Sequence, residues 1–150
     1  MMLFNRVKSC SVEEIAPDKL EVKGLFIDSF HEICLRLEVN ATDMVIVKAE
    51  SEMIRVPQTY CREVAAVGAN LEGIKIGPGA TKAIQHAVGD AHGCTHVADL
   101  ALDAIKAVIQ ANFKLQRRDM TQEERIALNY NKLVNTCHHW TKLGEELQLK

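Results

Sequence analysis

The chain has 150 residues, of which 47% are apolar and 25% charged, and its formal net charge is −2 at pH 7. This length is enough to bury roughly two-thirds of the unfolded surface in a single core, so we expect one domain over residues 1–150. The scattered basic residues argue against a nucleic-acid-binding stripe or a polybasic membrane anchor. No apolar run approaches the roughly 20 residues that span a bilayer.

The cysteine pattern indicates a reducing compartment. Five cysteines are widely spaced, odd in number and free of any CxxC pair, which is not typical of a disulfide framework. The first ten residues, MMLFNRVKSC, interrupt their apolar run with polar side chains, so we expect no signal peptide. We therefore expect a cytoplasmic protein with free thiols.

Alternation of apolar and polar residues predicts three or four strands between Leu3 and about Arg55. Turn residues at 16–18 and 40–43 separate the strands. One face of the resulting antiparallel sheet should be buried. The positions expected on that face are Leu20, Val22, His31, Ile33, Leu35, Leu37, Val39, Val45, Val47, Ala49 and Met53.

From Pro57 onward the apolar period becomes helical. Pro57 suits the first turn of a helix, Thr95 can cap a long helix, and TQEE at 121–124 is a capping-box pattern. The expected helices cover about 57–71, 80–88, a long stretch opened by Thr95, and about 121–138 or beyond. The fold class that follows is α+β, in which C-terminal helices cover one face of an N-terminal antiparallel sheet.

Three side chains with metal-binding or nucleophilic chemistry are expected at one end of this sandwich. His31 has the parity of the buried strand positions, while Cys61 and Cys94 lie near predicted helix N-termini on the inward stripes. Helix N-termini favour the thiolate form of cysteine. His96 is an adjacent extra ligand, so the candidate metal set is His31, Cys61, Cys94 and His96.

Simpler interpretations compete with this one. Free cysteine is among the most buried residue types, so Cys61 and Cys94 could be small core side chains. His31 could bond a backbone carbonyl at the edge of the core. His138 and His139 are expected at the C-terminal end of the last helix, where positive charge is favoured. Gly77-Pro78-Gly79 lacks the phosphate-loop patterns and predicts a tight turn.

The segments LFNRVKS, DSFHE, IRVPQTYC, LEGIKIGPGATK, GCTH and NTCH resemble the bacterial family called domain of unknown function 2889. The likeness extends over essentially the whole chain, and IGPGATKAI with GCTHVADL is its most specific part. The resemblance implies no reaction. It implies that the family's recurring motifs contain Cys61, Gly77, Gly79, Gly93, Cys94, Thr95, His96 and Cys137.

A second stretch, CTHVADLALDAIKAVI, is similar to the final helix of iron–sulfur scaffold proteins of the NifU type. That likeness implies that Cys61 and Cys94 occupy two ligand positions and that His31 falls near the scaffold's aspartate. Ser29 stands where the scaffold has its first cysteine, and Gly93 where it has a histidine. These departures favour a single ion with mixed sulfur and nitrogen ligands over cluster assembly.

Three functions remain open at this point. The first is a metal- or iron–sulfur-binding accessory or carrier protein, with zinc or iron as cofactor, a metal-delivery or pathway protein as partner and a homodimer as a possible assembly. The second is a small enzyme acting on a small metabolite, metal-assisted or with Cys94 as nucleophile beside His31 or His96. The third is a non-catalytic interaction subunit in which GCTH merely begins a helix.

Overall fold

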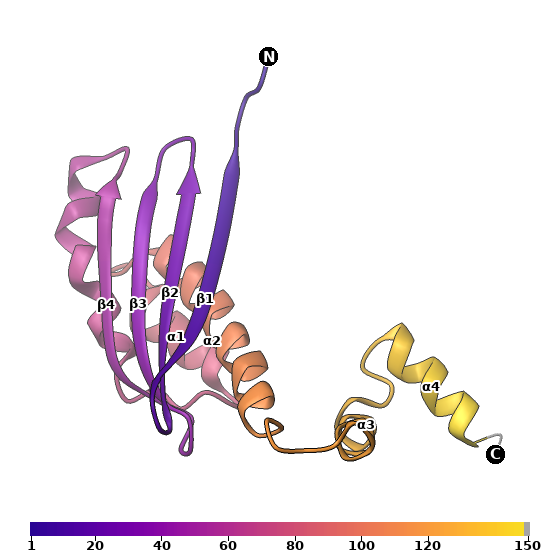
Figure 1. Cartoon of the computed structure of the whole chain (residues 1–150). Coiled ribbons are helices and arrows are strands. Elements are labelled where there is room, and N and C mark those ends of the chain that lie inside the picture. The colour runs from indigo at the N-terminus through magenta and orange to yellow at the C-terminus, as the bar shows by residue number, and fades with distance from the viewer. Residues whose placement is uncertain (149–150) are drawn as a thin grey trace. The chain divides into compact units, whose positions relative to one another are not determined.

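The computed structural model describes residues 1–148, and the chain divides into two compact units, Met1–Asn112 and Phe113–Lys150. The first unit contains the sheet and the helices packed on it (Figure 1). The second contains the two C-terminal helices. A single domain over residues 1–150 stays a prediction.

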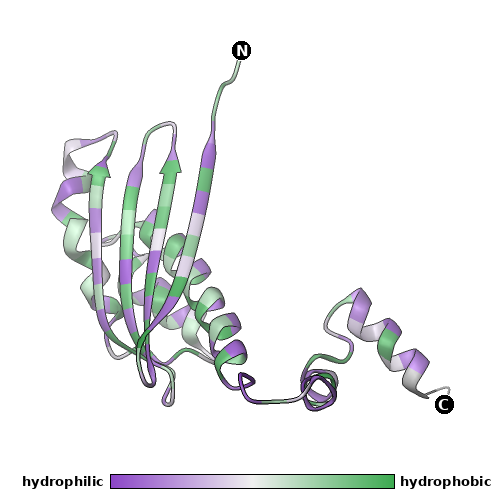
Figure 2. Cartoon of the chain, viewed as in Figure 1, coloured by the Kyte–Doolittle hydropathy of each residue, from purple (hydrophilic) through white to green (hydrophobic). Residues whose placement is uncertain are grey.

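The first unit is built on a four-stranded antiparallel meander in which every strand pairs with its neighbours in sequence. Its strands are β1 (Arg6–Ala16), β2 (Lys19–Asp28), β3 (Glu32–Asn40) and β4 (Val45–Arg55). Apolar and polar residues alternate along each strand (Figure 2). Because successive side chains of a strand point to opposite faces, this alternation gives one apolar face. The predicted α+β class and N-terminal sheet are confirmed.

Three helical elements cover the apolar face of the sheet (Figure 1). They are η1, a 3₁₀ helix (Thr59–Leu71), and the α-helices α1 (Ala80–Val88) and α2 (Thr95–Leu115). The side chains of Phe26, Ile33 and Leu100 are fully buried in the resulting core. Gly24 permits the close approach of α2, because a Cβ there would lie 3.2 Å from the side chain of Leu100. The core therefore lies between the sheet and α2.

The prediction that Val45 and Val47 lie on the buried face is wrong, because Ile46 is the buried residue between them. Ile46 pairs with Val39 and Lys48 pairs with Glu38, so Val47 is an extra residue in β4. Such a bulge shifts the side-chain parity by one, which turns Ile46 into the core and leaves Val47 49% exposed.

The helices of the first unit follow the predicted boundaries closely. η1 begins at Thr59 and is kinked at Val64, whereas α1 has the predicted bounds. Thr95 is the first residue of α2 and not the residue before it. The start of α2 is fixed by a tight loop, in which Cys94 N donates to the carbonyl oxygen of Val88 at 2.6 Å. Within residues 1–148 no helix is both long and apolar enough to cross a membrane.

The prediction of one helix over about 121–138 is wrong, because the second unit has two helices over this stretch and beyond. α3 (Gln122–Leu133) ends at a break, and α4 (His138–Gln148) follows. Asn135 has a φ of 63° in this break, a conformation that asparagine tolerates better than most residues. His138 therefore begins a helix instead of ending one. The predicted capping box is confirmed, since Thr121 and Glu124 bond reciprocally to each other's backbone N–H.

Candidate functional site

The turn between β2 and β3 positions two of the site residues. Asp28 ends β2, and its backbone N–H donates to the carbonyl oxygen of His31 at 2.9 Å. From β4, Arg55 Nη2 donates to the carbonyl oxygens of Asp28 and His31 at 2.9 and 3.1 Å. The backbone on both sides of the turn is thus tied to the neighbouring strand.

The carboxylate of Asp28 is buried and accepts four hydrogen bonds. Its Oδ1 accepts from the backbone N–H groups of Phe30 and His31, at 2.8 and 2.7 Å, and from His31 Nδ1 at 3.0 Å. Its Oδ2 accepts from Arg6 Nη2 at 3.1 Å. Burial alone would raise the pKa of Asp28, but these hydrogen bonds outweigh burial and hold its pKa far below the usual range. Asp28 is therefore ionised at neutral pH.

An ionised Asp28 fixes the state of the His31 ring. A carboxylate without a proton can only accept, so Nδ1 of His31 must carry the hydrogen that it donates. In the neutral imidazole the lone pair then lies on Nε2. The side chain of His31 is 12% exposed. His31 therefore has a fixed orientation and one free basic nitrogen.

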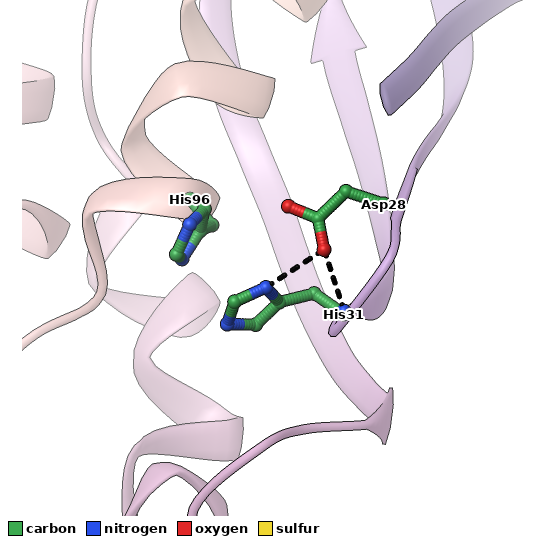
Figure 3. Close-up of side chains that lie close together, drawn as sticks. All are labelled: Asp28, His31 and His96. Atoms are coloured by element: carbon green, nitrogen blue, oxygen red, sulfur yellow. Dashed lines mark hydrogen bonds and ion pairs between the residues drawn. The ribbon is translucent and has the colours of Figure 1, made fainter. Parts of the chain in front are cut away.

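His96, the second residue of α2, lies against His31 (Figure 3). The two imidazole ring centroids are 4.0 Å apart, and the ring of Phe26 contacts His96 edge-on at 5.1 Å. Burial lowers the pKa of His96, and the neighbouring His31 lowers it further. The negative charge of Asp28 raises this pKa, but by less than burial and His31 lower it. His96 is therefore neutral at physiological pH.

Asp28, His31 and His96 together form a cluster with metal-ligating potential. One ligand atom from each lies within 4.8 Å of those of the other two. Figure 3 shows the carboxylate oxygen that is not bonded to His31 on the side of His96. The residues come from the end of β2, the following turn and the first turn of α2. We call these three residues the Asp–His–His cluster.

The four sequence-predicted ligands are distributed unevenly around this cluster. His31 and His96 belong to it, and Cys94 is adjacent, with its Sγ 3.9 Å from His96 Nδ1. Cys61 is half-buried on η1 and is not among the three clustered residues. Cys137, which belongs to the NTCH segment, is exposed in the second unit.

Sequence reasoning missed Asp28, although a signal was present. Along β2 the buried positions are alternate residues, and Asp28 continues the parity of Val22 and Phe26. A carboxylate at a buried strand position, three residues before a histidine of the same face, needs partners. That combination would have pointed to the pair.

Comparison with family models assigns the chain. The model described as "Protein of unknown function (DUF2889)" matches residues 8–110. The chain belongs to the DUF2889 family. The search of curated proteins and that of solved structures returned no match. The DUF2889 match contains all three cluster residues and lies within the first compact unit. The likeness to NifU-type scaffolds stays a prediction.

Proposed function

We propose that this DUF2889 protein binds one divalent transition-metal ion at the Asp–His–His cluster and serves as a small metal-binding accessory or carrier protein. The observation that carries the proposal is the convergence of the three side chains, with ligand atoms within 4.8 Å of one another. A two-histidine, one-carboxylate set is suited to iron(II) or zinc and leaves coordination positions open.

The hydrogen bonds of the cluster support this role. The ion would take the place of the hydrogen between His31 Nδ1 and Asp28 Oδ1, whose separation of 3.0 Å fits two ligands of one ion. Oδ2 of Asp28 faces His96, and either oxygen of this carboxylate could serve as the third ligand (Figure 3). The lowered pKa of His96 also favours metal binding, because a histidine ligand must be neutral.

A single ion fits the cluster better than an iron–sulfur cluster does. Iron–sulfur clusters are held mainly by cysteine thiolates. The cluster contains none, and Cys94 contacts His96 without belonging to it. We therefore propose zinc or iron(II) as the cofactor and assign Cys94 a neighbouring position.

A second candidate function is acid–base catalysis on a small metabolite. The Asp28–His31 hydrogen bond favours it, because an oriented imidazole with a free Nε2 is the usual form of a general base. In that case His31 would accept the proton and the neutral His96 would bind the substrate. Metal titration separates this candidate from the first.

The deciding experiment titrates the metal-free full chain with Zn²⁺ by calorimetry and with Co²⁺ by visible absorption. Each of His31→Ala and His96→Ala should weaken binding at least about 100-fold, because each removes a ligand. His86→Ala is the matched control, since His86 is an exposed histidine on α1. Cys94→Ser should leave the affinity within about threefold. Equal affinities of the parent and both cluster variants would contradict the proposal.

A further inference from the structure

Arg6 stands beside the Asp–His–His cluster in a preorganised position. It lies directly opposite Asp28 in the β1–β2 pairing and therefore on the helix-covered face of the sheet. Its guanidinium carbon lies 4.8 Å from the ring centroid of Phe26 and 5.2 Å from that of Phe4. Stacking between aromatic rings restricts the guanidinium plane before any ligand arrives.

Most of the hydrogen-bonding capacity of Arg6 is unused. A guanidinium has five N–H donors, and within residues 1–148 Arg6 makes one hydrogen bond, from Nη2 to Asp28 Oδ2. Its side chain is 41% exposed, so solvent reaches the remaining donors. Arg6 therefore holds Asp28 with one N–H and can present others to a ligand.

The charge of the site favours an anion once a metal ion is bound. Asp28 and Arg6 neutralise each other, and the two histidines are uncharged in the ligand state. A divalent ion would leave the site strongly positive. The ion's open coordination positions and the free donors of Arg6 would then lie around the same carboxylate.

From this arrangement we propose that the bound metal ion and Arg6 together bind a small oxyanion, the carboxylate or phosphate group of a metabolite. The inference rests on the proposed metal site and names the class of ligand that completes it. One oxygen of the anion would bind the metal, and a second would accept from Arg6. Arginine suits this task better than lysine, because its planar fork matches two oxygens of a carboxylate or phosphate.

The test adds anions to the Co²⁺-loaded full chain and follows the visible spectrum of the metal. Malonate and inorganic phosphate are titrated separately, so that the two arms distinguish a carboxylate from a phosphate ligand. We expect at least one of them to change the cobalt spectrum saturably. Arg6→Lys should weaken that anion at least tenfold, measured at saturating Co²⁺ so that a change in metal affinity does not enter.

Arg36→Lys is the matched control, because Arg36 is exposed on the opposite face of the sheet. It should bind the anion like the parent. A parent chain that shows no cobalt spectrum would overturn the proposed function together with this inference. A cobalt spectrum that neither anion changes, or an anion affinity equal in the parent and Arg6→Lys, would overturn this inference alone.

Discussion

The two compact units of the chain differ sharply in how much apolar surface their helices bury. In the first unit, the 21-residue α2 has eight buried residues and packs on the sheet. In the second, the 12-residue α3 has none. The family match and the Asp–His–His cluster both fall in the first unit. Stability and function are therefore expected to come from the sheet unit.

The helical unit depends on local interactions. The Thr121 capping box contributes about 1 kcal/mol to a helix, and isolated helices of α3's length are marginal in water. The cations of Arg117 and Lys132 lie over the ring of Phe113, at 4.8 and 5.6 Å. These contacts are weak individually, so the second unit should tolerate substitution more readily than the first.

The strongest test of this difference is Phe26→Ala. Phe26 is fully buried and its ring contacts both His31 and His96, so the change should cost about 3–5 kcal/mol of unfolding free energy. Ile126→Ala on α3 is the control and should cost less than about 1 kcal/mol, because Ile126 is 45% exposed. Urea unfolding followed by circular dichroism measures both. The single tryptophan, Trp140, reports the helical unit separately. Equal costs would refute the comparison.

A smaller effect is expected for Asp28→Asn, and it should depend on pH. At pH 7 the loss of the charge-assisted hydrogen bonds should cost about 2 kcal/mol. The folded-state pKa of Asp28 lies below its unfolded value, so its stabilisation is complete above the unfolded pKa of about 3.9. It is lost as the pH falls through the folded pKa.

The free energies of unfolding of the parent and Asp28→Asn should therefore converge as the pH is lowered from 5 to 2. Asp103→Asn is the control, because Asp103 is more exposed and bonds Lys8 near the surface. It should cost less than about 1 kcal/mol at pH 7. A difference between the parent and Asp28→Asn that is constant over this pH range would contradict the ionised Asp28.

The smallest effect should come from removing residues 116–150, which deletes the helical unit after the end of α2. The thermal unfolding midpoint and the Co²⁺ affinity of the shortened chain should stay close to those of the full chain. Differential scanning calorimetry and the cobalt titration check these two quantities. Loss of folding would show that the sheet unit needs the helical one.

Sequence periodicity predicted the parts of the fold in which one face of an element is buried. The inward parity of Ile33, Leu35 and Leu37 and the buried stripe of α2 both followed from it. Asp28 was missed because a lone aspartate after a strand resembles an ordinary turn residue. Its importance depends on contacts with Arg6 and His31 that connect separate elements.

The misplaced expectations have local physical causes. The inward stripe expected for Cys61 assumed a regular α-helix, whereas η1 has 3₁₀ geometry with a kink at Val64. The break between α3 and α4 depends on the left-handed conformation of Asn135, and asparagine also occurs within helices. The period of apolar residues in the sequence predicts neither the 3₁₀ geometry of η1 nor the break at Asn135.

The bulges of the sheet also bear on how chain length can vary within this fold. Three exposed apolar residues, Ile15, Val47 and Ile54, are the unpaired residues at the three register shifts of the sheet. Loss of Val47 would bring Ile46, Lys48 and Ala49 into strict alternation, with the first and last still facing the core. Deletion of the unpaired residue at any of these three positions would therefore preserve which residues face α2, so β1 and β4 can lose a residue there without a change in the register of the remaining pairs.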